Sequence, residues 1–185
     1  MNYNNALLAQ QAFKAVMNAF ARPFRVYRLP EGLSELGESP ALKLLAFTLT
    51  DNTVTLYVHD GAAEAELREL TSAGRAELEL ADFVILRGSD GYGLLSRVRR
   101  GDLIDPQKGA TVIIYLPRLE GAVSIRAAGP GIDGEMIFAA SECVSSYLRE
   151  SSELDIEYPA GFEMLFVTPR GELLAAPRRV RREVL

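Results

Sequence analysis

Residues 110–116 have the sequence ATVIIYL, a short apolar run with almost no polar side chain. Two further runs of this kind are ADFVIL at residues 81–86 and FEMLFV at residues 162–167. A strand that is buried on both faces needs no alternation of apolar and polar residues, so such runs are typical of central strands in a covered sheet. The three runs therefore predict the middle of a buried sheet.

Helical segments alternate with these strands along the chain. Apolar side chains recur three or four positions apart in residues 5–21, 41–49, 62–73 and 142–150, which predicts four helices. Ser39-Pro40 and Ser141 are expected to begin the second and the fourth, and Gly74 to end the third. Further strands are predicted at residues 24–29, 53–58 and 172–177, and two more around a tight turn in residues 122–140.

This interleaving indicates an α/β protein. We expect one domain spanning residues 1–185, with a three-layer α/β/α arrangement in which helices cover both faces of a mixed sheet. A surface pair between Glu64 and Arg68 is expected on the third helix, because residues four apart are neighbours on a helix surface.

Composition and charge exclude several classes of protein. The 185 residues carry a net charge of −5 with an isoelectric point near 5.1, which argues against nucleic acid as the main partner. Cys143 is the single cysteine and His59 the single histidine, so neither an internal disulfide nor a metal cluster is expected. The N-terminal segment has no signal-peptide core, and no run approaches the ~20 apolar residues that span a bilayer. We expect a soluble cytoplasmic protein.

A glycine-rich segment has the spacing of a nucleotide-binding loop. Gly129, Gly131 and Gly134 spell G-x-G-x-x-G after a predicted strand. Such a loop needs a helix N-terminus behind it to present amide groups to pyrophosphate, whereas the following residues, EMIFA, predict a strand. Pro130 also removes one amide donor. A tight turn is the favoured interpretation, and a nucleotide site is the alternative.

Two basic features have a structural and a functional interpretation. The segment from Asp105 to Lys108 has the sequence of a type I turn, and Lys108 is either part of that turn only or a contact for a phosphate or a partner carboxylate. A C-terminal cluster is either a solvated tail or a surface that docks on an acidic partner. Replacing this cluster with alanine is expected to leave the melting temperature almost unchanged, because surface ion pairs are worth about 0–1 kcal/mol. Its members are Arg178, Arg179, Arg181 and Arg182.

The first predicted helix has a wide apolar side. At ~100° per residue its apolar side chains cover an arc of roughly 200°, whereas a surface helix needs a stripe of only about 100°. The helix is either well buried in its own domain or packed on its own domain and on a second subunit. The arc consists of Leu8, Ala12, Phe13, Ala15, Val16, Met17, Ala19 and Phe20.

Several segments give the chain a resemblance to a known family along nearly its whole length. They are Phe13-Lys14-x-x-Met17-x-x-Phe20-Ala21-Arg22-Pro23, residues 45–51, residues 101–111 (GDLIDPQKGAT), residues 129–132, Tyr158-Pro159-x-Gly161-Phe162-Glu163 and Pro177-Arg178. In this order they resemble the PhnH family, a subunit of the bacterial carbon–phosphorus lyase. Residues 101–111 are the strongest match. The chain departs from the usual family pattern at Lys14, Phe24, Glu163, Arg179 and Val180.

The resemblance implies a fold like the large domain of pyridoxal-phosphate-dependent transferases, without that cofactor. It also implies a homodimer inside a core complex with the other carbon–phosphorus lyase subunits. That complex displaces adenine from a nucleoside triphosphate with an alkylphosphonate, which gives a ribose 1-alkylphosphonate 5-triphosphate. The chain itself is then an obligatory subunit with an architectural role and no catalytic residue. Arg22, Lys108 and Arg178 lie in the family's motifs and are the expected ligand or partner contacts.

The lysines agree with the lack of a pyridoxal site. That cofactor needs a Schiff-base lysine and an acid for its ring nitrogen, and by position Lys14, Lys43 and Lys108 show no acid partner. Two alternatives to the subunit remain. One is a stand-alone small-molecule enzyme that uses carboxylates such as those of Asp51, Asp105 or Glu163, and the other is a nucleotide- or phosphonate-binding module built on the Gly129 turn and Lys108.

Overall fold

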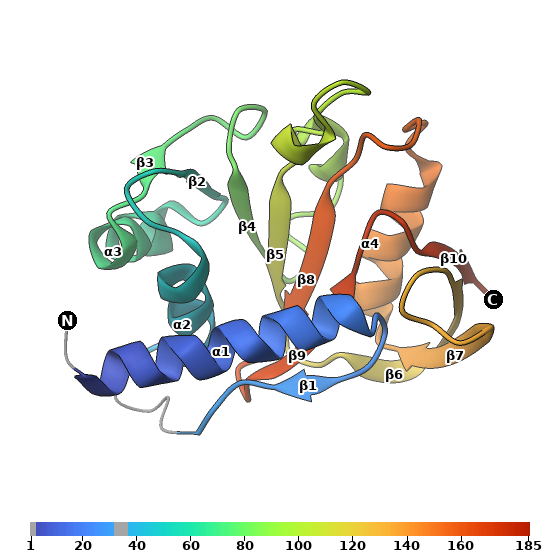
Figure 1. Cartoon of the computed structure of the whole chain (residues 1–185), viewed down its shortest axis with the longest axis horizontal. Coiled ribbons are helices and arrows are strands. Elements are labelled where there is room, and N and C mark those ends of the chain that lie inside the picture. The colour runs from blue at the N-terminus through green and yellow to red at the C-terminus, as the bar shows by residue number, and fades with distance from the viewer. Residues whose placement is uncertain (1–2, 32–36) are drawn as a thin grey trace.

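The computed structural model describes residues 3–31 and 37–185, and its centre is a seven-stranded sheet (Figure 1). The strand order is β1-β9-β8-β5-β4-β2-β3. The bounds are β1 Tyr27–Arg28, β9 Glu172–Ala176, β8 Glu163–Val167, β5 Thr111–Tyr115, β4 Phe83–Arg87, β2 Thr55–Val58 and β3 Gly74–Arg75. Neighbours from β3 to β8 pair in parallel, while β9 pairs antiparallel with both β8 and β1, so the prediction of a mixed sheet is confirmed.

The three apolar runs form the adjacent strands β4, β5 and β8, as predicted. Ile85 lies opposite Ile113, and Ile113 lies opposite Leu165, and all three side chains are fully buried. Burying a large aliphatic side chain stabilises a fold by about 1.5–3 kcal/mol relative to its exposure. These neighbouring strands therefore form the most strongly stabilised part of the sheet.

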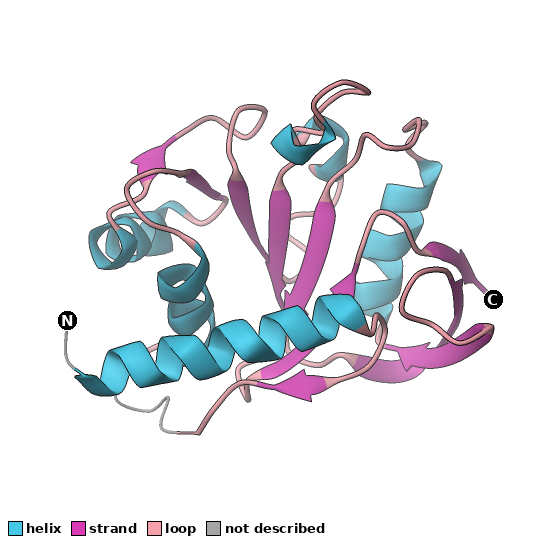
Figure 2. Ribbon diagram, viewed as in Figure 1, coloured by secondary structure: helices cyan, strands magenta, loops and turns pink. Residues whose placement is uncertain are grey.

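Layers of structure cover both faces of the sheet. On one face Ile85, Ile113 and Leu165 pack against α1 (Tyr3–Ala21), α2 (Pro40–Leu49) and α3 (Gly61–Thr71). Because successive side chains of a strand point to opposite faces, the alternate residues Val112 and Met164 pack on the other face, together with α4 (Glu142–Glu153). Figure 2 shows α1 crossing the strands and α4 beside a smaller sheet.

The smaller sheet is antiparallel and has the order β10-β6-β7, with β6 Glu120–Ala128, β7 Glu135–Ala140 and β10 Arg181–Val184. Its β6–β7 connection contains the three glycines of the nucleotide-like motif. A strand rather than a helix follows them, so the prediction of a glycine-rich turn is confirmed. Strand β10 was not predicted. Residues 181–184 pair with residues 125–128 of β6 instead of forming a free tail.

Some local predictions are wrong. A strand was expected over residues 24–29, but only residues 27–28 form one, β1. The Phe24 N–H donates to the Ala175 carbonyl, and the φ of 59° at Phe24 then turns the backbone away from an extended conformation. Ser39 precedes α2 but makes no side-chain cap, since its hydroxyl lies 3.5 Å from the Arg87 guanidinium instead. By contrast, Ser141 caps α4 as expected, accepting a 3.3 Å bond from the Val144 N–H.

The third helix also differs in detail. Glu64 pairs with Arg75 of β3 at 3.2 Å, not with Arg68 of its own helix. The helix ends at Thr71 and Gly74 opens the next strand, so Gly74 is not its cap. No helix in the described part of the chain is long and apolar enough to cross a membrane.

Candidate functional site

Three of the motif segments meet at the end of the large sheet where its parallel strands begin. Glu163 opens β8, and Arg178 lies two residues beyond the end of β9. Because β8 and β9 are antiparallel neighbours, with Met164 opposite Ala176, the start of one strand lies beside the end of the other. We call Glu163, Arg178 and Arg182 the arginine junction.

Arg178 is the hub of this junction. Its backbone N–H donates to Glu163 Oε2 at 2.9 Å, and its Nε donates to Glu163 Oε1 at 2.6 Å. Its Nη1 donates to three backbone carbonyls, those of Pro106 at 2.7 Å, Gly161 at 3.1 Å and Pro159 at 3.3 Å. The Arg178 and Glu163 side chains are only 19% and 24% exposed. Charge-assisted bonds in such partly buried positions are stronger than neutral ones, so Arg178 joins the residue 106 turn, the residue 159–163 segment and the end of β9.

Glycines allow the backbone to approach Arg178 closely. A Cβ on Gly109 would overlap the Gly161 carbonyl oxygen and lie 3.1 Å from the Arg100 carbonyl oxygen. Gly161 has φ 136°, a conformation that side-chain-bearing residues rarely adopt, and a Cβ there would lie 3.2 Å from Arg178 Cβ. Gly101 has φ 66° and closes the same loop from the other side. The glycines of the motif segments therefore serve close packing around the hub.

The loop from Gly101 to Lys108 is held by its own hydrogen bonds. Asp102 Oδ1 accepts from the Ile104 and Asp105 N–H groups at 2.8 and 2.7 Å, and Lys108 donates to Asp105 Oδ2 at 2.6 Å. This ion pair raises the pKa of Lys108, while the bonds from Lys108 and Gln107 lower the pKa of Asp105. The chain turns at residues 105–108 as predicted, with the Lys108 N–H donating to the Asp105 carbonyl at 3.1 Å, and residues Pro106–Lys108 form a short 3-10 helix, η3, that was not predicted.

The tip of this loop presents apolar side chains to solvent. Ile104 is 89% exposed and Leu103 is 54% exposed. A rigid loop loses little conformational entropy when its tip is covered, so this tip is suited to contact with another protein. It lies on the same segment that Arg178 fixes through the Pro106 carbonyl.

Arg182 of β10 reaches the junction from the smaller sheet. It donates to Ser151 Oγ at 2.8 Å and to the carbonyls of Pro177 and Val180 at 3.3 and 3.4 Å. Its Nε is buried without an acceptor, and no carboxylate of a described residue lies within 4 Å of it. Burial lowers the pKa of Arg182 to about 10, although the carboxylate of Glu163 raises it. Arg182 and Arg178 both line a hollow of about 120 Å³.

Of the two interpretations of the C-terminal cluster, the solvated tail is therefore wrong for Arg178 and Arg182, and replacing the cluster with alanine is now expected to lower the melting temperature. Both guanidinium groups are hydrogen-bonded inside the fold, because β10 pairs with β6 and carries the chain back over the sheet. Arg179 lies 5.6 Å from the ring centre of Tyr158, and Arg181 is exposed. A partner contact through Arg178 stays a prediction.

The other expected contact, Arg22, lies elsewhere on the surface. It follows the end of α1 and is exposed, and its side chain forms no hydrogen bond or ion pair with another described residue. The glycine turn packs between the end of α1 and the residue that precedes β10. A Cβ on Gly131 would meet the Ala21 carbonyl, and one on Gly129 would lie 3.2 Å from Val180. Lys108 and Arg178 are joined through one loop, whereas Arg22 is not part of the junction.

The residues considered for catalysis in a stand-alone enzyme are in environments that do not favour that role. The Asp51 carboxylate accepts from the Thr53 N–H at 2.8 Å and from its hydroxyl at 2.6 Å, and these bonds lower the Asp51 pKa. Burial raises the pKa of the Cys143 thiol, which disfavours the thiolate that a nucleophile requires. No group of three or more acidic, histidine or cysteine side chains that could hold a metal occurs among the described residues.

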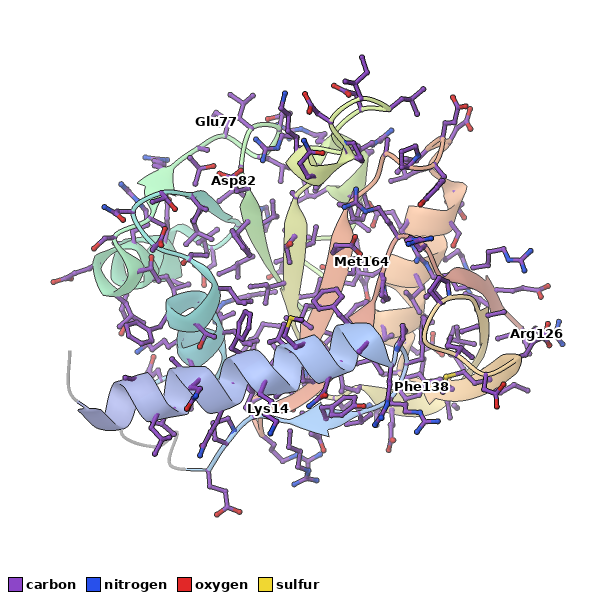
Figure 3. All side chains as sticks on the ribbon, viewed as in Figure 1. Lys14, Glu77, Asp82, Arg126, Phe138 and Met164 are labelled. Atoms are coloured by element: carbon purple, nitrogen blue, oxygen red, sulfur yellow. The ribbon has the colours of Figure 1, made fainter. Side chains whose placement is uncertain are left out.

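The lysines differ from expectation. Lys14 projects from α1 into solvent (Figure 3). Lys43 is buried in α2 and forms an ion pair with Glu66, and Lys108 pairs with Asp105, so the expectation that these two lack an acid partner is wrong. Lys43 lines a separate hollow of about 170 Å³ with Asp60 and Arg87, beyond the ends of β2 and β4.

Sequence reasoning named Arg182 only as part of the charge run, and missed both its internal position and its partner Ser151. The available signal was the spacing of two between Val180, Arg182 and Val184, which places the three side chains on one face of a strand. Val180 is buried on that face, so Arg182 is carried inward with it. Because four arginines lie close together here, the segment was interpreted as a charge run and its alternation of inward- and outward-facing residues was overlooked.

Comparisons with known proteins agree with the motif segments. A family model described as bacterial phosphonate metabolism protein (PhnH) matches residues 3–183. A putative C-P lyase subunit protein, HtxG, of Stutzerimonas stutzeri is 31% identical over 170 residues, which cover 91% of this chain and 83% of the relative. The alpha-D-ribose 1-methylphosphonate 5-triphosphate synthase subunit PhnH of Rhizobium meliloti (strain 1021) is 24% identical over 189 residues, covering 95% of this chain and 90% of the relative.

Proposed function

This chain belongs to the PhnH family of bacterial phosphonate metabolism proteins, and from that premise we propose that it is an obligatory, non-catalytic subunit of a carbon–phosphorus lyase complex. The complex makes a ribose 1-alkylphosphonate 5-triphosphate from a nucleoside triphosphate and an alkylphosphonate. The observation that carries the proposal is the match of nearly the whole chain to proteins whose names designate a subunit of such a system.

The arrangement of polar groups supports an architectural role over a stand-alone enzyme. The three carboxylates considered for catalysis, Asp51, Asp105 and Glu163, each accept hydrogen bonds that hold a turn or join two segments. None of them lines one of the described hollows with a nucleophile or a base. Their bonds are those expected of structural groups.

The finer expectations about the fold and its setting are also part of the proposal. We infer a cytoplasmic protein in which residues 1–185 form one domain related to the large domain of pyridoxal-phosphate-dependent transferases, without that cofactor. One sheet with apolar layers on both faces supports this, as does the engagement of Lys43 and Lys108 in ion pairs.

The tip of the 101–108 loop is the proposed contact with another subunit of the complex. The occupant is a protein surface with an apolar recess, because Leu103 and Ile104 are aliphatic and Ile104 is almost fully exposed. Hydrogen bonds within the loop and the bond from Arg178 to Pro106 fix the tip before binding. Lys108, which is 60% exposed, lies at the base of the same loop and is placed to meet a partner carboxylate at the rim.

Replacing Ile104 with aspartate tests this contact and the proposed function together. Placing a charge in an apolar recess is expected to abolish co-purification with the other subunits, since central apolar contacts cost about 2 kcal/mol or more when lost. In a host strain that lacks its own copy, the wild-type chain should restore growth on methylphosphonate as the phosphorus source and the variant should not. Affinity pull-down and growth rate are the measurements.

The matched control for this variant is Ile137→Asp. Ile137 is 65% exposed on β7, outside the loop, and should leave assembly and growth unchanged. Equal assembly of both variants rejects the loop as the contact. Failure of the wild-type chain to assemble or to restore growth rejects the subunit function itself.

The outer side of α1 is the proposed homodimer contact, as the wide apolar arc suggested. Ala12, Val16 and Ala19 are buried against the sheet and α2, which accounts for one part of the arc. Phe13 and Met17, one turn apart on the helix, are 50% and 54% exposed. Large apolar side chains that are adjacent and exposed in the single chain are the type of surface that subunit contacts bury.

The double variant Phe13→Glu, Met17→Glu is expected to convert a dimer into a monomer. Four glutamates would face one another across a two-fold contact, and like charges are repelled most when water is excluded. Light scattering should give twice the mass of 20.3 kDa for the wild type and that of one chain for the variant. Lys14→Glu is the control, because Lys14 is exposed on the polar side of α1 (Figure 3). A monomeric wild type at micromolar concentration contradicts the dimer.

A further inference from the structure

The hollow at the arginine junction differs in charge from the other described hollows. Arg178 and Arg182 line it, and no carboxylate is among its described lining residues. The other described hollows are each lined by carboxylates as well as by basic groups. Among the described hollows, this one is therefore lined by charges of one sign.

Among the described residues, the two arginines of this hollow have one counterion, the Glu163 carboxylate. Both oxygens of the Glu163 carboxylate accept from Arg178, and Arg182 has only carbonyl and hydroxyl acceptors. Nη2 of Arg178 has no acceptor among the described residues, and Nη2 of Arg182 has one, Ser151 Oγ. A guanidinium taken out of water is costly unless an anion or a full set of acceptors compensates it. Two guanidinium groups and one carboxylate leave a place for a second anion.

The other walls of the hollow are apolar. Leu154, Ile156 and Phe162 line it beside the arginines. The volume is about 120 Å³, whereas pockets that bind drug-sized ligands measure about 300–1,000 Å³. The hollow is thus too small for a nucleotide and has room for a small oxyanion that carries one short alkyl group.

We propose that this hollow binds a small tetrahedral oxyanion of the phosphate or phosphonate class, with its oxygens between Arg178 and Arg182. The Nη2 groups of Arg178 and Arg182 have donor hydrogens left for it, and guanidinium groups match the geometry of such oxygens. An alkyl substituent lies against Leu154 and Ile156. That the biological ligand is an alkylphosphonate rests on the proposed function. The oxyanion site itself follows from the charges and the size of the hollow.

Titration of the full chain with methylphosphonate, inorganic phosphate and acetate tests the site. Calorimetry should show saturable binding of methylphosphonate and phosphate, each with a rise in melting temperature because a ligand of the folded state stabilises it. Stronger binding of methylphosphonate than of phosphate identifies a phosphonate site, and the reverse order identifies a phosphate site. Acetate binding of equal strength overturns the assignment and indicates that a partner's carboxylate side chain fills the hollow. No saturable binding of either tetrahedral anion overturns the proposal.

Two variants locate the binding. Arg182→Gln should weaken oxyanion binding at least tenfold, a change of about 1.4 kcal/mol, while Arg181→Gln, an exposed neighbour on the same strand, should leave it unchanged. Ile156→Glu retains both arginines and brings a carboxylate into the hollow, so it should abolish binding, and thermal melting checks that the variant remains folded. Unchanged affinity in both junction variants shows that the anion binds elsewhere and refutes the site. A chain that joins the complex but binds no oxyanion refutes this inference alone, and a chain that binds the oxyanion but never assembles refutes the proposed function alone.

Discussion

Replacing Arg178 with alanine is expected to lower the free energy of unfolding by about 3 kcal/mol, because the change leaves the Glu163 carboxylate and several carbonyls without their donor. The guanidinium makes one bond to Glu163 and three to backbone carbonyls, in a position that is only 19% exposed. For a chain of this size about 1 kcal/mol shifts the melting temperature by about 2–4 °C. We expect a fall of roughly 6–12 °C in calorimetry.

Companion variants separate the hub from general charge effects. Arg181→Ala removes an exposed arginine of the same cluster and should change stability by less than about 0.5 kcal/mol. The double variant Arg178→Ala, Glu163→Ala should lose less stability than the sum of the single variants, because the pair is then removed together. A melting temperature for Arg178→Ala within 1–2 °C of the wild type, roughly the effect of 0.5 kcal/mol, contradicts the internal role of this side chain.

Replacing Gly109 with alanine is expected to cost about 3 kcal/mol or more, since overpacking against fixed backbone cannot be relieved by a rotamer change. The added Cβ would overlap the Gly161 carbonyl oxygen and press on the Arg100 carbonyl and Arg178 Nη1. Either the loop moves away from β8 or Arg178 loses its carbonyl partners. A low yield of folded protein and a large drop in the denaturation midpoint are the expected observations.

Gly61→Ala is the matched control for this substitution. Gly61 opens α3, its φ is not in the left-handed region, and an added Cβ would meet nothing within 4 Å. Alanine there should be neutral or should stabilise by up to about 1 kcal/mol, because it lowers the entropy of the unfolded chain. If Gly109→Ala is as stable as Gly61→Ala, the close approach of residues 109 and 161 does not exist in solution.

The central sheet could be predicted from sequence because its signal is local. The runs that form β4, β5 and β8 are apolar over their whole length, and no tertiary contact is needed to recognise them. Ser141 likewise caps α4 with a side chain that acts three residues away. These predictions depend on propensity and periodicity, which act within one segment.

The arginine junction could not be predicted in the same way because its partners are far apart in sequence. Arg178 binds Pro106, which is 72 residues distant, and Arg182 binds Ser151, which is 31 residues distant. A charge run is solvated in most proteins, so a tail was one of the two interpretations, and neither interpretation placed an arginine inside the fold. The rule failed here because Val180 is buried and the pairing of β10 with β6 draws the neighbouring arginine inward.

The seven-stranded sheet ends at both edges in a strand of two residues, β1 and β3. Such short edge strands present very few unpaired N–H and C=O groups with which another polypeptide chain could pair. Runaway polymerisation of the large sheet into fibrils is thereby disfavoured even though its central strands have the composition of aggregation-prone peptides. A neighbouring chain must therefore recognise the large sheet by the shape and charge of its side chains rather than by adding a strand to it, whereas the smaller sheet keeps longer edge strands in β7 and β10.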